Sequence, residues 1–373
     1  MMRCLYTATT SAAPRRTAAA AAAAAVAAAA RSPTPSPSGR RTVHTFVKQH
    51  QGAVKIFTSD WAHEKLPDGH RFPMTKYKLV RRELETDASL KGKIEILRSP
   101  LIAREDLELV HCGTYVDRVF TGGLTAKESR AIGFPWSEAG VQRYRASAGG
   151  TLAALHAVMG DEGAMVASHA AGGTHHAFRD SGEGFCVFND IAVAAVTAQS
   201  VYGASALPIL VLDLDVHQGN GTAEIFQNDD SVFTFSIHGA NNYPWKTRRK
   251  SDLDVDVPDN TSDEDYLSIL STHLRDLFDQ VGPRLVIFQA GVDGLREDSF
   301  GRLALTRQGL IKRNNLVYDL CLARGCKLLI CMGGGYSRPI DATVEAHADV
   351  FRVAALKYSA AAPSFDSATA SSA

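Results

Sequence analysis

The stretch ILVLDLDVHQGNG, residues 209–221, passes from an unbroken apolar run into the polar residues Asp213, Asp215 and His217. Apolar runs without alternation are typical of strands that are buried on both faces of a parallel sheet. Ligands of such sheets bind beyond the carboxyl ends of the strands. Three more apolar runs end on metal-ligand or catalytic residue types, at 169–176 (HAAGGTHH), 286–294 (VIFQAGVDG) and 328–336 (LLICMGGGY). These segments are predicted to converge, and the pattern favours a metal-dependent hydrolase.

The rest of the chain alternates apolar, β-branched runs with amphipathic helical patterns, as expected for repeated βα units. Strands are predicted at 164–169, 209–215, 232–238, 285–290 and 327–332. Helices are predicted at 137–159, 262–280 and 306–324. The second begins with a Ser-x-x-Asp capping box, and the first and third end at Gly160 and Gly325. We expect one three-layer α/β domain at residues 50–358, with a mainly parallel central sheet flanked by helices.

The first 59 residues differ in composition from the rest. They contain no Asp or Glu, eight Lys or Arg, and many Ala, Ser, Thr and Pro residues. This composition is typical of an organellar transit peptide, which we place at residues 1–41 and expect to be disordered. The Ser- and Pro-rich segment at 32–41 favours the chloroplast, with the mitochondrion as the alternative. A simple disordered tail is the competing interpretation, and the Ala- and Ser-rich residues 359–373 are predicted to form a flexible tail.

The charge and hydropathy of the chain argue against nucleic-acid and membrane partners. Of 40 basic and 40 acidic residues, six arginines precede residue 42, so a mature domain has 34 basic and 40 acidic residues. The basic cluster at 246–250 is followed at once by three aspartates and is predicted to be a solvated loop. The alanine run at 18–30 is too short and too weakly apolar to span a bilayer, which needs about 20 apolar residues.

A metal site is predicted around the strand that ends the opening stretch. If the extended conformation continues, Asp213, Asp215 and His217 share one face, because side chains alternate along a strand. Asp and His suit Zn²⁺ or Fe²⁺, and Asp293 would complete a three-ligand site with an open position for water. The alternative for Asp215 and His217 is a simple hydrogen bond at the strand end.

Two other segments offer groups for catalysis. His175 and His176 are adjacent, and one of them is the obvious base for activating water, with Asp213 available to orient an imidazole. Three consecutive glycines at 333–335 suggest a backbone that passes close to a bulky group. The Tyr336 hydroxyl beside them is placed to donate to an oxygen that becomes negative during hydrolysis. A plain tight turn is the alternative for the glycines.

Together these motifs resemble the zinc-dependent histone deacetylase family, which shares its fold with the arginases. The matching segments are GGTHHA, GEGFCVFND, DLDVHQGNGT, QAGVDGL and GGGYSR, which follow the family's order and spacing. The resemblance covers roughly residues 55–350. The Asn within HQGNG and the segment GFPWSEAGVQRYRASAGG are more similar to the bacterial and class IV branch than to the nuclear class I enzymes.

The resemblance implies a role for each candidate residue. It implies that one zinc ion is bound by Asp215, His217 and Asp293, and that the catalytic residues are His175, His176, Asp213 and Tyr336. In these roles His176 is the general base and then the general acid, His175 is tuned by Asp213, and Tyr336 polarises the amide carbonyl. The substrate-binding residues include Gly184 and Phe185 in the wall of the acyl channel, and Gly334. Asp213 and Ser236 match a structural potassium site, and Lys76 falls near a channel arginine of many relatives.

Two departures from the family pattern affect the substrate. Asn220 stands where class I enzymes carry an Asp beside the second histidine. The loop that offers a peptide-binding Asp in many relatives is Gly-Phe-Pro-Trp at 133–136, so Phe134 and Trp136 are predicted to form an apolar rim. Small N-acetyl amines such as N-acetylserotonin are therefore candidate substrates beside acetyl-lysine in proteins, acetylpolyamines and longer acyl-lysines.

Other functional classes fit the motifs less well. An arginase-type hydrolase needs a second metal and more bridging carboxylates than the chain offers. An inactive acyl-lysine-binding protein should have lost Tyr336, His176 or Asp293, and a structural subunit of a chromatin complex needs access to the nucleus. The sequence leaves the oligomeric state open.

Overall fold

The computed structural model describes residues 52–160 and 164–360. Its centre is one sheet of eight strands in the order β2-β1-β3-β8-β7-β4-β5-β6, and every neighbouring pair is parallel. The strands are β1 Val54–Thr58, β2 Ile94–Arg98, β3 Val166–His169, β4 Ile209–Asp213, β5 Val232–Gly239, β6 Leu253–Val257, β7 Leu285–Gln289 and β8 Lys327–Cys331. The predicted fold class is confirmed.

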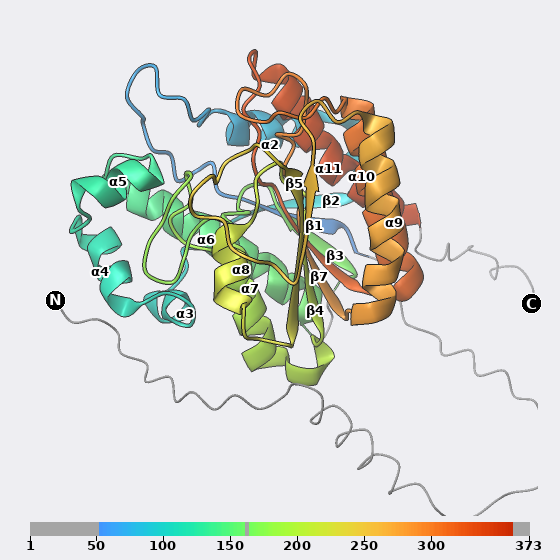
Figure 1. Ribbon diagram of the computed structural model, residues 1–373, viewed down its shortest axis with the longest axis horizontal. Helices are drawn as coiled ribbons and strands as arrows, with labels where there is room; N and C mark the ends of the chain where they lie inside the picture. Colours follow the sequence, from blue (N-terminus) through green and yellow to red (C-terminus); the bar gives the residue numbers. More distant parts are fainter. Residues whose placement is uncertain (1–51, 161–163, 361–373) are drawn as a thin grey trace, which may run out of the picture. The chain divides into compact units, whose positions relative to one another are not determined.

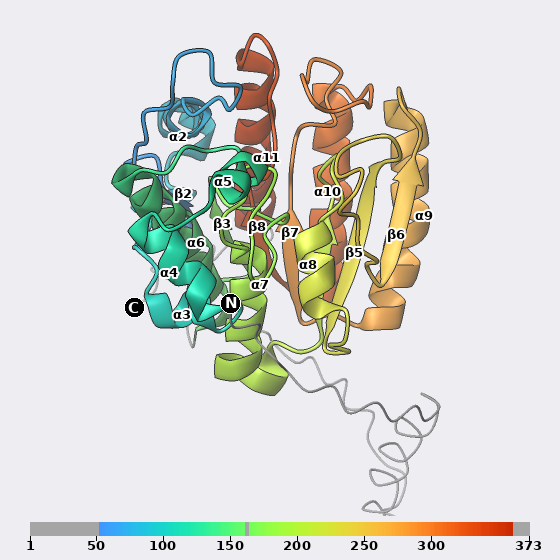
Figure 2. The same ribbon diagram turned by 60° about the vertical axis from the view of Figure 1, so that its left-hand side comes forward.

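Helices cover both faces of this sheet (Figures 1 and 2). One layer consists of α2 Lys76–Thr86, α9 Asp263–Val281, α10 Arg307–Arg324 and α11 Asp341–Ala360. The other layer is built on α6 Glu138–Met159, α7 Asp190–Thr197 and α8 Asn220–Phe226, with the short helices α3 Arg104–Glu108, α4 Gly113–Thr121 and α5 Ala126–Ile132 beside α6. Three layers result, as predicted.

The unbroken apolar run of β4 is explained by these two helical layers. Leu210 and Leu212 pack into the core on the α9 to α11 side, whereas Ile209 and Val211 pack into the core on the α6 and α7 side. All four side chains are essentially fully buried. Each fully buried aliphatic side chain contributes about 1.5–3 kcal/mol, so a polar residue at any of these positions would cost much of the domain's stability.

Capping residues set the ends of the predicted helices. The hydroxyl of Ser262 accepts from the backbone N–H of Asp265, 3.2 Å away, at the start of α9. Thr306 caps α10 in the same way through Gly309. Gly325 ends α10 with a left-handed φ of 65°, a conformation that costs glycine little. The three predicted helices are each confirmed to within one residue of their predicted ends.

Three of the strands, and the helices other than α6, α9 and α10, were not predicted. The strands β1, β2 and β6 are short and lie towards the edges of the sheet, where one face is partly exposed and the sequence alternates. Asp254 and Asp256 lie within β6, whereas 246–250 forms no regular element, in agreement with the predicted loop. Helix α11 continues to Ala360, two residues past the predicted domain boundary. The predicted transit peptide and most of the predicted carboxyl-terminal tail lie outside the described residues.

In the part of the chain that the structure describes, no helix combines the length and apolar character needed to cross a membrane. The carboxyl ends of the eight parallel strands lie at one edge of the sheet. The four segments that were predicted to converge all run into loops that leave this edge.

Candidate active site and metal centre

The candidate residues converge at the carboxyl edge of four neighbouring strands, β3, β8, β7 and β4. Asp213 is the last residue of β4, and Asp215 and His217 follow it directly. The loops after β3, β7 and β8 deliver the histidine pair, Asp293 and Tyr336, respectively. Residues as far apart in sequence as His175 and Tyr336, 161 positions, thus lie close together because the strands are parallel and adjacent.

Asp215, His217 and Asp293 form a buried group whose ligand atoms all lie within 4.8 Å of one another. The Nδ1 atom of His217 lies 3.0 Å from Oδ1 of Asp215 and 3.0 Å from Oδ2 of Asp293. The structure therefore brings together the three residues that were predicted as metal ligands. In the described residues this is the one group of three or more His, Cys, Asp or Glu side chains with such a geometry.

The route to this geometry differs from the predicted one. Strand β4 ends at Asp213, so the strand alternation does not extend to His217. The chain turns instead, because the carboxylate of Asp213 accepts from the N–H of Asp215 at 3.1 Å, and the carboxylate of Asp215 accepts from the N–H of His217 at 3.0 Å. Side-chain acceptors that bind the backbone two residues ahead favour such turns over an extended strand.

The surroundings of this group fit a zinc ion. Burial and the nearby charge of Asp215 raise the pKa of Asp293, a repulsion that a divalent cation would relieve. Oδ2 of Asp215 accepts from the N–H of Gly334 at 2.9 Å and from Nε2 of Gln289 at 3.0 Å, which leaves Asp215 held in one orientation. Carboxylate oxygens and imidazole nitrogens are both zinc ligands, and three protein ligands leave a fourth position open, as in catalytic zinc sites.

Gly334 packs directly against Asp293 and Asp215, two of the predicted metal ligands. A Cβ atom at this position would lie 2.0 Å from Oδ2 of Asp293 and 2.9 Å from Oδ2 of Asp215. This close approach explains the glycine run beside Tyr336. Gly334 is not among the residues that line the active-site cavity; it shapes the metal-ligand site, and its role in substrate binding stays a prediction.

The two adjacent histidines have different environments. His175 is buried with Nδ1 2.6 Å from Oδ2 of Asp213; burial alone would lower its pKa, but Asp213 and Asp215 raise that pKa to about 8. His176 lies in the wall of the cavity. Burial, together with His175 and His217, lowers the pKa of His176 well below its usual value. His176 is thus a neutral imidazole that is suited to accept a proton.

The partner of His176 is Asn220, and behind Asn220 lies a carboxylate that the sequence did not reveal. Nδ1 of His176 is 2.7 Å from Oδ1 of Asn220. The Nδ2 amide of Asn220 donates to Glu183 at 2.7 Å and to the carbonyl of Thr247 at 3.0 Å. Both of these partners accept only, so they determine which end of the amide faces His176. Oδ1 then accepts a hydrogen bond from the Nδ1–H group and leaves Nε2 of His176 unprotonated as the free base.

A second contribution that sequence reasoning missed is the support of the histidine loop by Asp190. Its carboxylate accepts from the N–H of Gly173 at 3.0 Å and from the N–H of Thr174 at 2.7 Å. It also accepts from the Thr151 hydroxyl. The turn that presents His175 is therefore tied to the start of α7. The FND sequence at 188–190 belongs to a segment that resembles the family, but its residue pattern carries no signal for this role.

The active-site cavity has a volume of about 600 Å³. Its lining combines His176, His217 and Tyr336 with the channel residues Gly184 and Phe185. Gly184 has a φ of 57°, and a Cβ there would lie 2.7 Å from the ring of His176. The remaining lining residues are Arg71, Arg130, Ala131, Ile132, Gly133, Asn242, Tyr243, Trp245, Ser299, Phe300, Gly301 and Arg302.

The aromatic rim differs from the predicted one. Phe134 is buried behind Phe185, with ring centroids 5.4 Å apart, and Trp136 donates its indole N–H to the carbonyl of Val119 and packs on Gly122. Neither residue lines the cavity. The correction follows from the left-handed Gly133, which turns the chain inward and buries the ring of the next residue. Tyr243 and Trp245 supply the aromatic surface instead.

Tyr336 borders the cavity beside the metal-ligand group. Burial raises its pKa well above the usual value, so the hydroxyl remains a proton donor. Its ring packs on Phe300, with centroids 4.9 Å apart. Nζ of the buried Lys76 lies 4.8 Å from the same ring and donates to the carbonyl of Gly335 at 3.3 Å. Burial lowers the pKa of Lys76 to about 8.

Comparison with known proteins agrees with this geometry. Residues 70–352 match the model of the histone deacetylase domain. The chain belongs to the histone deacetylase family. It is 45% identical over 289 residues to an uncharacterized protein of Picosynechococcus sp., with 78% of this chain and 94% of that protein covered. It is therefore a hydrolase of the deacetylase or amidohydrolase type.

Curated members of the family are more distant. Histone deacetylase 2 of Arabidopsis thaliana is 28% identical, with 72% of this chain and 70% of that protein covered. The histone deacetylase-like amidohydrolase of Pseudomonas aeruginosa is 27% identical, with 76% and 77% covered. The crystal structure of the HDA15 HD domain superposes with a TM-score of 0.67 at 23% identity, covering 84% of this chain and 94% of that chain, which shows the shared fold.

The potassium site that the resemblance implies stays a prediction. Asp213 and Ser236 are register partners on β4 and β5. The Ser236 hydroxyl lies 2.9 Å from Nδ1 of His238.

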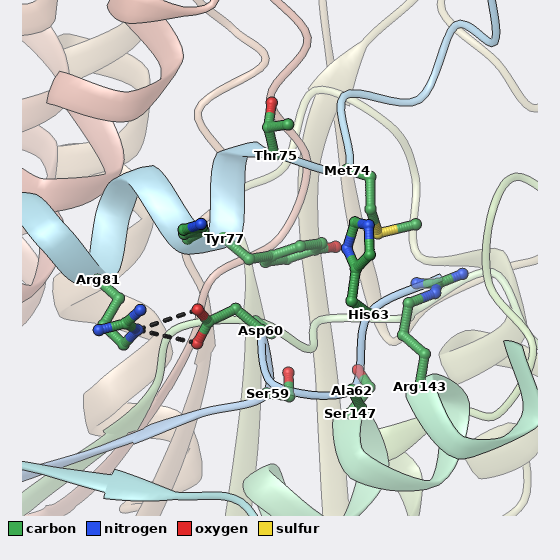
Figure 3. A pocket seen from close by; sticks show the side chains of 12 residues that line it. Ser59, Asp60, Ala62, His63, Met74, Thr75, Tyr77, Arg81, Arg143 and Ser147 are labelled. Atoms are coloured by element: carbon green, nitrogen blue, oxygen red, sulfur yellow. Dashed lines mark hydrogen bonds and ion pairs between the residues drawn. The ribbon is translucent and has the colours of Figure 1, made fainter. Parts of the chain in front are cut away.

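A second cavity, of about 420 Å³, is lined by residues that include Met74, Tyr77 and Ser147. Figure 3 shows Tyr77, His63 and Arg143 around it, with the ion pair between Arg81 and Asp60 at its edge. The guanidinium of Arg143 also donates to Glu64 at 3.0 Å and stacks on Phe134. This cavity does not share a lining residue with the active-site cavity.

Arg313 of α10 forms hydrogen bonds to the loops that carry the predicted metal ligands, and its side chain is 1% exposed. It donates to the carbonyls of Leu214, Ala290 and Gly291 at distances of 2.6–3.1 Å. One guanidinium thus joins the ends of β4 and β7. We predict that Arg313→Leu lowers the free energy of unfolding by about 3–5 kcal/mol, because three buried carbonyls lose their donor.

Denaturant titration of the full chain checks this prediction. The matched control is Arg275→Leu, since Arg275 is an exposed arginine in the middle of α9; its effect should stay within about 0.5 kcal/mol. A loss below about 1 kcal/mol for Arg313→Leu would show that the carbonyls find other donors.

Proposed function

We propose that the chain is a zinc-dependent deacylase that removes acetyl or longer acyl groups from N-acylated amines. The candidate substrates are acetyl-lysine in proteins and small N-acetyl amines such as N-acetylserotonin. The observation that supports this proposal best is the meeting of the Asp215, His217 and Asp293 group with His176 and Tyr336 around one cavity. Asp215, His217 and Asp293 would hold the zinc ion, which supplies Lewis-acid activation of an amide carbonyl and of water.

The residues of the chain itself suggest how the amide bond is hydrolysed. Phe185, Tyr243 and Phe300 enclose a narrow acyl group and exclude bulk water from it. Nε2 of His176, left unprotonated by the Asn220 contact, takes the proton of the attacking water and returns it to the leaving amine. The Tyr336 hydroxyl donates to the carbonyl oxygen as that oxygen becomes negative. The products are a carboxylic acid and a free amine.

The same geometry argues against the two competing classes, a ureohydrolase and an inactive binding protein. A ureohydrolase needs two bridged metals, but the described residues offer three ligands in one group. An inactive binding protein has no need for an oriented base. His176 is such a base, because Asn220 and Glu183 fix its orientation. We therefore favour turnover over binding alone.

The direct test is hydrolysis by the purified full chain, with release of the free amine measured for each substrate. The panel consists of acetyl-lysine peptides, N-acetylserotonin, an acetylpolyamine and a longer acyl-lysine peptide. We expect measurable kcat/KM on at least the acyl-lysine peptides in the zinc-loaded protein. Tight binding of these peptides with no release of acid would support the binding-protein alternative instead.

We further propose an organellar location, with the chloroplast favoured over the mitochondrion. The support is the acid-free, Ala- and Ser-rich composition of the first 59 residues. A fluorescent fusion of the full chain should accumulate in plastids of plant cells, and deletion of residues 1–41 should abolish import and leave the enzyme active. Fluorescence confined to the nucleus would contradict this proposal.

A further inference from the structure

The outer part of the active-site cavity carries positive charge. Arg71 in the loop before α2, Arg130 in the last turn of α5 and Arg302 in the loop after β7 all line the cavity and are exposed. We refer to these three residues as the mouth arginines. No Asp or Glu is among the residues that line the cavity in the described part of the chain.

The charge of this mouth is largely uncompensated. Arg302 lies 3.2 Å from the carboxylate of Asp259, but both side chains are partly exposed, so this pair is weak. Arg71 rests on the ring of Phe300, with Cζ 5.2 Å from the ring centroid. Within residues 52–160 and 164–360, neither Arg71 nor Arg130 forms an ion pair. Two of the three guanidinium groups are therefore available to a substrate.

Carboxylates close to the cavity are committed to the protein. Asp298 accepts from the backbone N–H groups of Phe300, Gly301 and Tyr336 at 2.6–2.9 Å. Glu183 accepts from Asn220 and Thr247 at 2.7 Å. A substrate that approaches the cavity therefore meets guanidinium donors at the mouth and no carboxylate acceptor among the lining residues.

We infer that the mouth arginines select acyl-lysine residues that lie in acidic segments of protein. This inference rests on the proposed deacylase function. An acyl-lysine side chain that fills the channel leaves its neighbouring residues at the mouth, where Asp or Glu side chains pair with guanidinium groups in a two-pronged geometry. Lysine-rich peptides and acetylpolyamines place positive charge at the same point and are repelled.

The aromatic residues of the rim complete this surface. Trp245 is 71% exposed and lies edge-to-face on Tyr243, with ring centroids 5.6 Å apart. An exposed indole offers contact area to the substrate backbone without discriminating by charge. Selection among peptides of equal length therefore depends on the mouth arginines.

The test compares three acetyl-lysine peptides of equal length whose flanking residues are Asp and Glu, Gly and Ser, or Arg and Lys. At low ionic strength we expect kcat/KM for the acidic peptide to exceed that for the basic peptide by about tenfold or more. The ratio should shrink at about 0.5 M salt, where the Debye length is about 4 Å. Equal values for the three peptides, or a preference for the basic one, would overturn the inference.

Variants assign the effect to named residues. The double variant Arg71→Ala with Arg130→Ala should bring the acidic-to-basic ratio close to one, and Arg130→Glu should lower it further. Arg275→Ala on α9 removes an equally exposed arginine far from the cavity and should keep the ratio of the native protein. Because each ratio is measured within one protein, a change in folding or in zinc content cancels.

A failure of the proposed function is distinguishable from a failure of this inference. If no peptide is hydrolysed, the deacylase proposal fails, and the same fluorescently labelled peptides titrated by anisotropy still report the charge preference of the mouth. Tighter binding of the acidic peptide, lost in the Arg71 and Arg130 double variant, supports the inference. Binding that does not depend on peptide charge rejects it.

Discussion

Asp293→Ala is expected to lower the zinc content to a small fraction of one ion per chain and kcat/KM by at least about a thousandfold. Changes in residues that merely orient metal ligands already cost about 10- to 100-fold in other metal sites, so loss of a ligand should cost more. Asp293 is fully buried between His217 and the N–H of Val216, and among the described residues the group of ligand side chains has no fourth member. Metal analysis and acetate release measure the two effects separately.

The matched control is Asp279→Ala, which removes an exposed carboxylate paired with Arg324 on the surface of α9. It should retain full zinc content and activity. Treatment with a chelator should reproduce the Asp293→Ala defect in the native chain, and added Zn²⁺ should reverse it. Two ions bound at this site in the native chain would reopen the ureohydrolase alternative.

Tyr336→Phe is expected to lower kcat by about 100- to 1000-fold with zinc content unchanged. The hydroxyl is the one part of the side chain that is lost, while the ring contacts with Phe300 and Lys76 persist. Removing a donor to a developing oxyanion typically has an effect of this size. Because that interaction strengthens in the transition state, KM should change much less than kcat.

Tyr358→Phe is a suitable control for this substitution. The hydroxyl of Tyr358 in α11 has no hydrogen-bond partner among the described residues, so its removal should leave kcat unaltered. Native-like activity of Tyr336→Phe would transfer the oxyanion role to another group and leave the zinc prediction intact.

The fold was predictable from the sequence where the sequence carries a one-dimensional signal. The strands β3, β4, β5, β7 and β8 are central in the sheet, so helices bury both of their faces and their apolar runs are continuous. Helix ends were predictable because Ser262 and Gly325 act within their own turn. The strands β1, β2 and β6 were not predicted because buried and exposed side chains mix within each of them, so their sequences contain no continuous apolar run.

The site was predictable to the extent that each residue type implies its own chemistry. Asp215, His217, Asp293 and Tyr336 follow apolar runs, and the parallel arrangement of those runs makes their ends meet. The predicted reason for the Asp215 and His217 geometry was nevertheless wrong, because a local turn replaces the extended strand after Asp213. Similar residue positions can thus follow from different backbone paths.

The sequence by itself determined the fold class and the set of metal-ligating and catalytic residue types, since burial of apolar strands and the donor chemistry of Asp, His and Tyr are properties of the residues themselves. Tertiary structure alone decided which residues surround that chemistry. Trp245 rather than Trp136 lies at the cavity, and Glu183 orients Asn220. The mouth arginines line one cavity although Arg71 and Arg302 are 231 positions apart in the sequence. The physical reason is that loop conformation and side-chain direction depend on contacts distant in sequence, which no local pattern encodes.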